Sequence, residues 1–187
     1  MLAVATSRSA SSIDTFIASK TLLSISRLLA AIVALVITTA AQAQTIHRRV
    51  IGVTDGDTIA LLDVNRTQYK IRLSGIDAPE KRQAFGNVSK QNLARLIFQK
   101  EVTVEYNKRD RHGRIVGKVF LDGNDICIRQ IEDGLAWHFK KYENEQPALD
   151  RARYKGAEST ARAARVGLWN EPHPYPPWDF RIAKPGI

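Results

Sequence analysis

The sequence offers few covalent or metal cross-links and little of the composition that keeps a chain unfolded. Cys127 is the one cysteine among 187 residues, which excludes an internal disulfide framework and a Cys-rich zinc site. Eleven glycines and seven prolines are too few for a collagen-like or low-complexity chain. The four histidines are scattered without metal-ligand spacing, and neither a Gly-rich phosphate loop nor a Gly-x-Ser-x-Gly motif is present. A globular protein held by its hydrophobic core is what remains.

Acidic residues are scarce relative to basic ones. The chain holds 28 Lys and Arg residues against 19 Asp and Glu residues, which gives a net charge of +9. A basic protein attracts polyanions such as nucleic acid, anionic lipid or polysaccharide. This attraction is not specific, so the charge alone does not choose among these partners.

The first 43 residues have the order of a secretory signal peptide. An uncharged run from Leu28 to Ala41 follows Lys20 and Arg27, and the small-residue triplet Ala41-Gln42-Ala43 ends the segment. Basic, apolar and small residues in this order predict cleavage before Gln44. The alternative is an uncleaved membrane anchor, although the run is short beside the roughly 20 residues of a spanning helix.

Cleavage would export the domain to the periplasm or the medium, without stable membrane association. The leader holds three basic residues and one acidic residue, so the net charge of the rest is +7. The basic character therefore belongs to the domain itself.

Five segments of the remaining chain are predicted to be β-strands, and the third and fourth alternate clearly between apolar and polar residues. In the third, Tyr69, Ile71 and Leu73 face one way, with polar residues between them. The five predicted strands cover residues 50–53, 58–64, 67–74, 101–106 and 115–121.

Three helices are expected beside the strands. Asn87 is a candidate cap for the first, which has an apolar face, and Asn124 or Asp125 for the second. Pro147 suits the first position of the third helix.

The order of these elements predicts an α+β fold with a mostly β core. Five short strands with a helix inserted after the third indicate a five-stranded OB-fold barrel with three helices. We expect a signal peptide over 1–43, the barrel domain over 44–170 and a proline-rich, extended tail over 171–187.

Two acidic motifs and two arginines carry the candidate chemistry, although each also has a purely structural interpretation. Asp55-Gly56-Asp57-Thr58 is also a common hairpin signal, and Asp77-Ala78-Pro79-Glu80 also reads as a helix capping box. Arg72 is equally an exposed cation of the sheet, and Arg114 a solubilising charge at a hairpin tip. Their order along the chain is more informative than any one of them.

Taken in order, these segments resemble the staphylococcal-type thermonuclease family. The similar motifs are Val53 to Thr58, Ile71 to Glu80 and Asp110 to Arg114, and later landmarks are Gly134-Leu135-Ala136 and Gly167-Leu168-Trp169. The resemblance covers roughly Arg49 to Asn170. It implies a monomeric, calcium-dependent endonuclease that hydrolyses DNA and RNA, prefers single strands and leaves 3′-phosphate ends.

The resemblance assigns the calcium ligands to the two acidic motifs. Asp57 and Asp77 match the carboxylate ligands, and Ala78 matches the position whose backbone carbonyl also binds the ion. The family often has Thr at this position, but a carbonyl ligand needs no particular side chain. Asp55 matches an acid beside the ligands that does not itself bind the ion. Calcium prefers such oxygen donors.

The resemblance assigns the catalytic roles to three further residues. Glu80 matches the general base, and Arg72 and Arg114 match the arginines that hold the scissile phosphate. A carboxylate can take a proton from the attacking water, and guanidinium groups bind phosphate oxygens with paired hydrogen bonds.

Two other classes of protein remain open from the residues. One is a non-catalytic OB-fold module that binds single-stranded nucleic acid, which needs only a basic and aromatic surface. The other is a membrane-anchored interaction protein, favoured if the leader stays attached. We expect Trp137 and Trp169 to be packing residues, and Cys127 to be a buried small hydrophobe.

Overall fold

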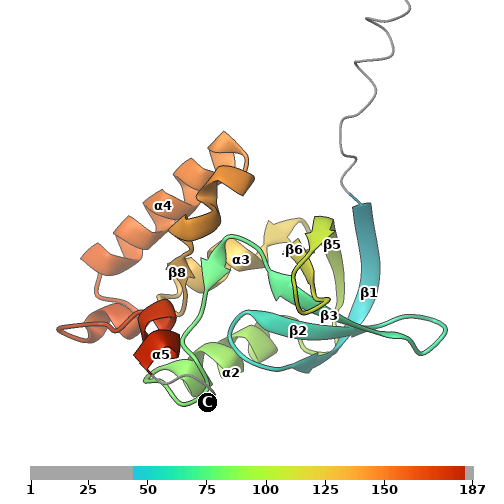
Figure 1. Cartoon of the computed structure of the whole chain (residues 1–187), viewed down its shortest axis with the longest axis horizontal. Helices are drawn as coiled ribbons and strands as arrows, with labels where there is room; N and C mark the ends of the chain where they lie inside the picture. Colours follow the sequence, from blue (N-terminus) through green and yellow to red (C-terminus); the bar gives the residue numbers. More distant parts are fainter. Residues whose placement is uncertain (1–43, 184–187) are drawn as a thin grey trace, which may run out of the picture. The chain divides into compact units, whose positions relative to one another are not determined.

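A computed structural model describes residues 44–183; the predicted signal peptide lies outside the described residues. Strands and helices follow the predicted order, with additional short strands and helical turns (Figure 1). The longer strands are β1 (Gln44–Val53), β2 (Thr58–Leu62), β3 (Gln68–Leu73), β5 (Glu101–Arg109) and β6 (Ile115–Leu121). The two-residue strands are β4 (Ile76–Asp77), β7 (Asn124–Asp125) and β8 (Trp137–His138).

The five longer strands close into a barrel. β1 pairs antiparallel with β5 through Gln44–Arg49 and with β2 through Arg49–Val53. β3 pairs with β2, and β6 pairs with β5. A parallel pairing of β3 with β6 then joins the two edges of the sheet and closes the barrel. This five-stranded mixed barrel with helices confirms the predicted α+β, OB-type fold.

The alternation seen in the sequence fills the barrel. Ile71 and Leu73 of β3 and Val102 and Val104 of β5 are fully buried, while the residues between them face outward. Burying a side chain of this size contributes about 1.5–3 kcal/mol relative to leaving it exposed. The barrel is therefore a packed core that fixes where each strand ends, and the site residues lie at those ends.

Three helices pack around the barrel: α2 (Gly86–Ile97), α3 (Ile126–Glu132) and α4 (Ala148–Ala163). Asp125 caps α3 as predicted, because its Oδ1 accepts hydrogen bonds from the backbone N–H groups of Cys127 and Ile128. The predicted cap at Asn87 is wrong, because α2 begins at Gly86 after a left-handed Phe85. Pro147 precedes α4 directly instead of opening it.

The expectation of an extended tail is wrong over its last described part. Within the predicted tail, Pro177–Ala183 form the short helix α5. Two helical turns, η1 (Lys140–Glu145) and η2 (Gly167–Asn170), come before the tail. A proline is compatible with the first turn of a helix, where its missing N–H group costs no hydrogen bond. Pro177 and Phe180 are buried, so α5 is docked on the domain.

A second, smaller core lies under the C-terminal elements. Trp137 and Trp169 pack edge to face with ring centroids 5.2 Å apart, beside Ala161 and Leu168. These contacts confirm the prediction that both tryptophans are packing residues. Cys127 is also buried, as expected. Within residues 44–183 no helix has the length and apolar character needed to span a membrane.

Candidate functional site

The first acidic motif forms the turn between β1 and β2. Thr54 N–H donates to the Thr58 carbonyl over 2.8 Å, and Asp57 N–H donates to Asp55 Oδ1 over 3.0 Å. The motif is therefore a hairpin turn, but it also directs Asp57 inward. Asp57 is 6% exposed, and its Oδ2 accepts the backbone N–H of Ala78 over 2.8 Å.

Gly56 lets this turn approach the second acidic motif closely. A Cβ atom at Gly56 would collide with Ser89 Oγ of α2 and lie 2.7 Å from the Cβ of Ala78. Gln130 of α3 holds the same turn from behind, because its Nε2 donates to the Gly56 carbonyl over 2.8 Å. Two helices thus fix the turn that carries Asp57.

The second acidic motif begins on β4, which pairs with β8 through Asp77 and Trp137. Asp77 is 1% exposed, and Ala78 beside it is also buried. Arg72 projects from β3, and its Nη2 lies 3.1 Å from Asp57 Oδ2 and 3.0 Å from Asp77 Oδ1. One guanidinium nitrogen therefore joins the two predicted calcium ligands, which are 20 residues apart in the chain.

Glu80 lies on the turn after Ala78, and the capping-box interpretation is wrong because no helix starts there. Its backbone N–H donates to Gln83 Oε1 over 3.1 Å. The close approach of Gly86 to the Glu80 carbonyl leaves no room for a Cβ atom there. The Glu80 side chain is one-third exposed, and its Oε1 lies 2.6 Å from Arg181 Nη1 of α5.

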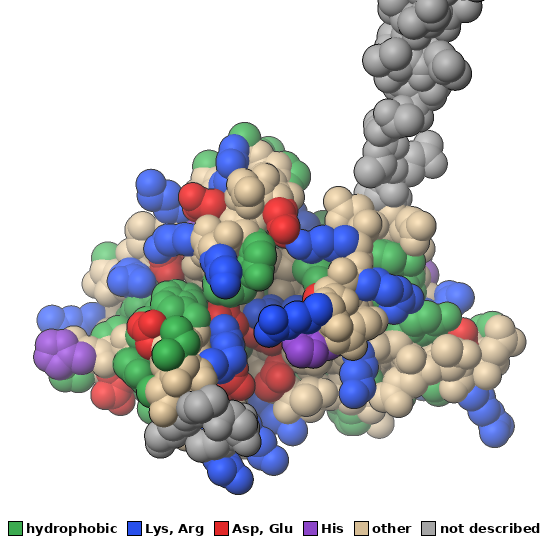
Figure 2. Space-filling model, in the orientation of Figure 1, with side chains coloured by type: hydrophobic (Ala, Val, Ile, Leu, Met, Phe, Trp, Pro, Cys, Tyr) green, Lys and Arg blue, Asp and Glu red, His purple; other side chains and the backbone are tan. Residues whose placement is uncertain are grey.

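Arg114 joins the cluster through a threonine. It directly precedes β6, whose parallel pairing with β3 places Val116 opposite Arg72. Its Nε donates to Asp110 Oδ2 over 2.7 Å, and its Nη1 lies 3.5 Å from Thr58 Oγ1. Thr58 Oγ1 in turn donates to Asp57 Oδ1 over 3.1 Å. The structure thus brings all six predicted site residues to one end of the barrel, and Figure 2 shows acidic side chains near the middle of one face with Lys and Arg side chains around them.

Burial of the carboxylates changes their proton affinity. Desolvation, together with the nearby charge of Asp57, raises the pKa of Asp55 to about 7. Burial also raises the pKa of Asp77, although hydrogen bonds and charge from Arg181 and Arg72 oppose that shift. The site is therefore an acidic cluster that favours cations, whether they are arginines or metal ions.

Asp55→Asn should change how stability depends on pH in chelator. The folded pKa of about 7 lies above the unfolded value of 3.8, so this group contributes stability at low pH. That contribution is lost as the pH rises from about 4 to 7, and it amounts to a few kcal/mol at most, since one pKa unit is about 1.4 kcal/mol.

The measurement is urea unfolding of wild type and Asp55→Asn at several pH values. We expect the variant to gain stability relative to wild type as the pH rises through this window. Asp122→Asn, at an exposed turn, is the control and should follow wild type. Parallel stability profiles for wild type and Asp55→Asn would contradict the raised pKa of Asp55 in the folded protein.

The sequence analysis assigned no role to three residues of the site. Thr58 connects Arg114 to Asp57, Gln130 holds the first turn, and Arg181 contacts both Asp77 and Glu80. Thr58 adjoins a predicted ligand, so a hydroxyl beside an acidic turn was a usable signal. Gln130 and Arg181 are distant in sequence, and only the fold brings them here.

The donor set fits a hard cation. Two carboxylates already share one cationic nitrogen, and oxygen atoms of this kind are the ligands calcium prefers. Within the described range, 44–183, no three His, Cys, Asp or Glu side chains are grouped as a metal site. A bound ion would therefore need backbone, water or substrate oxygens in addition to Asp57 and Asp77.

Comparison with known proteins agrees with this fold. Residues 70–171 match the family described as "Staphylococcal nuclease homologue". An "Uncharacterized endonuclease" of Escherichia coli is 41% identical over 140 residues, covering 74% of this chain and 87% of that protein. A "Micrococcal nuclease" of Shigella flexneri is 36% identical over 173 residues, covering 88% and 96% respectively. The chain belongs to the staphylococcal nuclease homologue family.

Proposed function

We propose that this protein is a calcium-dependent endonuclease that hydrolyses DNA and RNA, prefers single strands and leaves 3′-phosphate ends. Membership of a nuclease family supports the reaction class. The observation that carries the proposal is the meeting of Asp57, Asp77 and Arg72 at a single guanidinium nitrogen, with distances of 3.1 and 3.0 Å. Buried acids and an arginine in this arrangement suit a phosphate held beside a cation.

Asp57, Asp77 and the carbonyl of Ala78 are the groups that would hold calcium. When bound, the ion supplies positive charge that stabilises the negative charge developing on the phosphate. The protein's contribution is to keep the two carboxylates in place, through the Ala78 N–H, Thr58 and the β4–β8 pairing.

Glu80, Arg72 and Arg114 would carry the remaining steps. Glu80 takes a proton from the attacking water as the water oxygen bonds to phosphorus. The bond from phosphorus to the 5′ oxygen breaks, and the 5′ oxygen takes a proton from solvent. Arg72 and Arg114 bind the phosphate oxygens and exchange their present carboxylate contacts for them. The products are a 3′-phosphate and a 5′-hydroxyl.

Metal dependence is the direct test of this proposal. Purified protein should cleave a labelled single-stranded oligonucleotide in calcium, much less in magnesium and not at all in chelator. Magnesium is smaller and demands stricter octahedral geometry, so it should position the phosphate less well. Equal turnover with either ion, or full turnover in chelator, would contradict the proposal.

The alternative of a binding module without catalysis is less well supported. Such a module attracts a polyanion with basic and aromatic surface. Such binding does not require two carboxylates, with 6% and 1% exposure, at the same end of the barrel. Binding of an oligonucleotide without cleavage in calcium would favour the binding module.

We also propose that the protein is exported, to the periplasm or the medium. The order of basic, apolar and small residues in the leader supports this. The intact mass of the mature protein should begin at Gln44. A full leader on protein in the membrane fraction would favour the anchor instead.

A further inference from the structure

A helix from the C-terminal end of the described chain reaches into the site. Arg181 of α5 places Nη2 2.7 Å from Asp77 Oδ2 and Nη1 3.2 Å from Asp77 Oδ1. The same Nη1 lies 2.6 Å from Glu80 Oε1. One guanidinium thus occupies both oxygens of a predicted calcium ligand and one oxygen of the predicted base.

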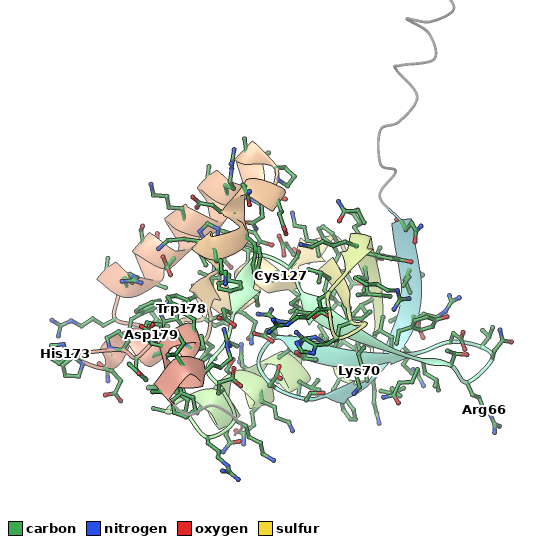
Figure 3. The ribbon with its side chains drawn as sticks, in the orientation of Figure 1. Arg66, Lys70, Cys127, His173, Trp178 and Asp179 are labelled. Atoms are coloured by element: carbon green, nitrogen blue, oxygen red, sulfur yellow. The ribbon has the colours of Figure 1, made fainter. Side chains whose placement is uncertain are left out.

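Arg181 is held there by a docked helix. Trp178, labelled in Figure 3, stacks on Phe139 with centroids 6.0 Å apart and packs edge to face against Trp137 at 6.2 Å. Gln83 donates a hydrogen bond to the carbonyl of Tyr175, which lies just before α5. Because Gln83 also accepts from the Glu80 N–H, the tail and the Glu80 turn are tied to each other.

These contacts compete with metal binding. A guanidinium that pairs with both oxygens of a carboxylate occupies the same oxygen atoms that a bound metal ion would use. The Arg181 side chain is 44% exposed whereas that of Asp77 is 1% exposed, so the arginine can return to solvent but the carboxylate cannot. The barrel's strand pairing does not include α5, so detachment of the helix would break no hydrogen bond between barrel strands.

We propose that α5 is an internal competitor for the metal site. Arg181 and calcium exclude each other at Asp77, and docking of Trp178 sets how strongly Arg181 competes. The helix therefore raises the calcium concentration at which the site fills and at which Glu80 is released. The inference rests on the proposed calcium site.

The test is calorimetric titration of calcium into purified protein without substrate, using three variants. Arg181→Ala removes the competing group, and Trp178→Ala loosens α5 but keeps its charge. Arg153→Ala on α4 is the matched control, since its side chain is 49% exposed and its ion pair with Asp150 spans 3.9 Å. Arg181→Ala should bind calcium at least about tenfold more tightly, because charge-assisted hydrogen bonds of the free state are lost.

The variants separate direct competition from a general effect of charge. Trp178→Ala should also bind calcium more tightly than wild type, although it removes no charge, and Arg153→Ala should match wild type. Wild-type calcium affinity in Arg181→Ala would overturn the inference. If wild type binds calcium and these shifts are absent, only the inference fails; if no variant binds calcium, the proposed function fails with it.

Discussion

Glu80→Gln should lower turnover by about 10²–10⁴, the usual contribution of general-base catalysis. Glutamine keeps the size and hydrogen-bonding capacity of the side chain but cannot accept the proton of the attacking water. Calcium binding and the fold should persist, because Asp57 and Asp77 are untouched and no helix depends on Glu80 for a cap. The measurement is turnover on a single-stranded oligonucleotide at saturating calcium, together with calcium affinity.

The control for this substitution is Glu132→Gln on α3, an exposed acid outside the site. It should leave turnover unchanged. Glu80 also fixes Arg181, so calcium affinity must be measured before a loss of activity is assigned to the proton transfer. Wild-type turnover in a folded, calcium-binding Glu80→Gln protein would remove Glu80 from the catalytic residues.

Arg72→Ala should destabilise the metal-free protein strongly. Arg72 pairs with Asp57 and Asp77, and its side chain is only 13% exposed. Removing one partner of a buried ion pair costs about 3–5 kcal/mol, and we expect the lower end because Arg181 still pairs with Asp77. Calcium should reduce the loss, because a cation on the same carboxylates replaces the missing charge.

Urea unfolding in chelator and in calcium measures both effects. Arg49→Ala is the control, because the Arg49–Glu101 pair is exposed and spans 3.9 Å, so its loss should cost less than about 1 kcal/mol. Turnover of Arg72→Ala should also fall, by about 10²–10³, if Arg72 binds the phosphate in the transition state. An equal loss of stability with and without calcium would contradict the claim that Arg72 and calcium interact with the same two carboxylates.

The barrel could be predicted from the sequence because strands such as β3 and β5 repeat apolar residues at every second position. Ile71 and Leu73 are buried as expected, and Asp125 caps its helix through hydrogen bonds to residues two and three positions on. Such patterns are local. The cap at Asn87 failed because a left-handed Phe85 and the tight contact of Gly86 with Glu80 start α2 two residues earlier, without a side-chain cap.

The site was predicted only in part, since its geometry depends on contacts between distant residues. The gathering of Asp57, Arg72 and Asp77 followed from family resemblance, because the β3–β6 pairing that closes the barrel leaves no periodic signal. The proline-rich tail predicted an extended chain, yet Pro177 fits the first turn of α5. Arg181 contacts Asp77 across 104 residues, and nothing in the sequence around it indicates that contact.

Cleavage by a variant that lacks both ligand carboxylates tests the central claim most directly. Asp57→Asn combined with Asp77→Asn keeps the side-chain shapes but removes the negative charge that holds calcium. The measurement is the rate at which an excess of protein cuts end-labelled single-stranded DNA in saturating calcium, after circular dichroism has established that the variant is folded. We expect the wild-type protein to cut the strand and the variant to be slower by at least about 10²-fold. Cleavage by the folded variant at the wild-type rate would show that the reaction takes place elsewhere.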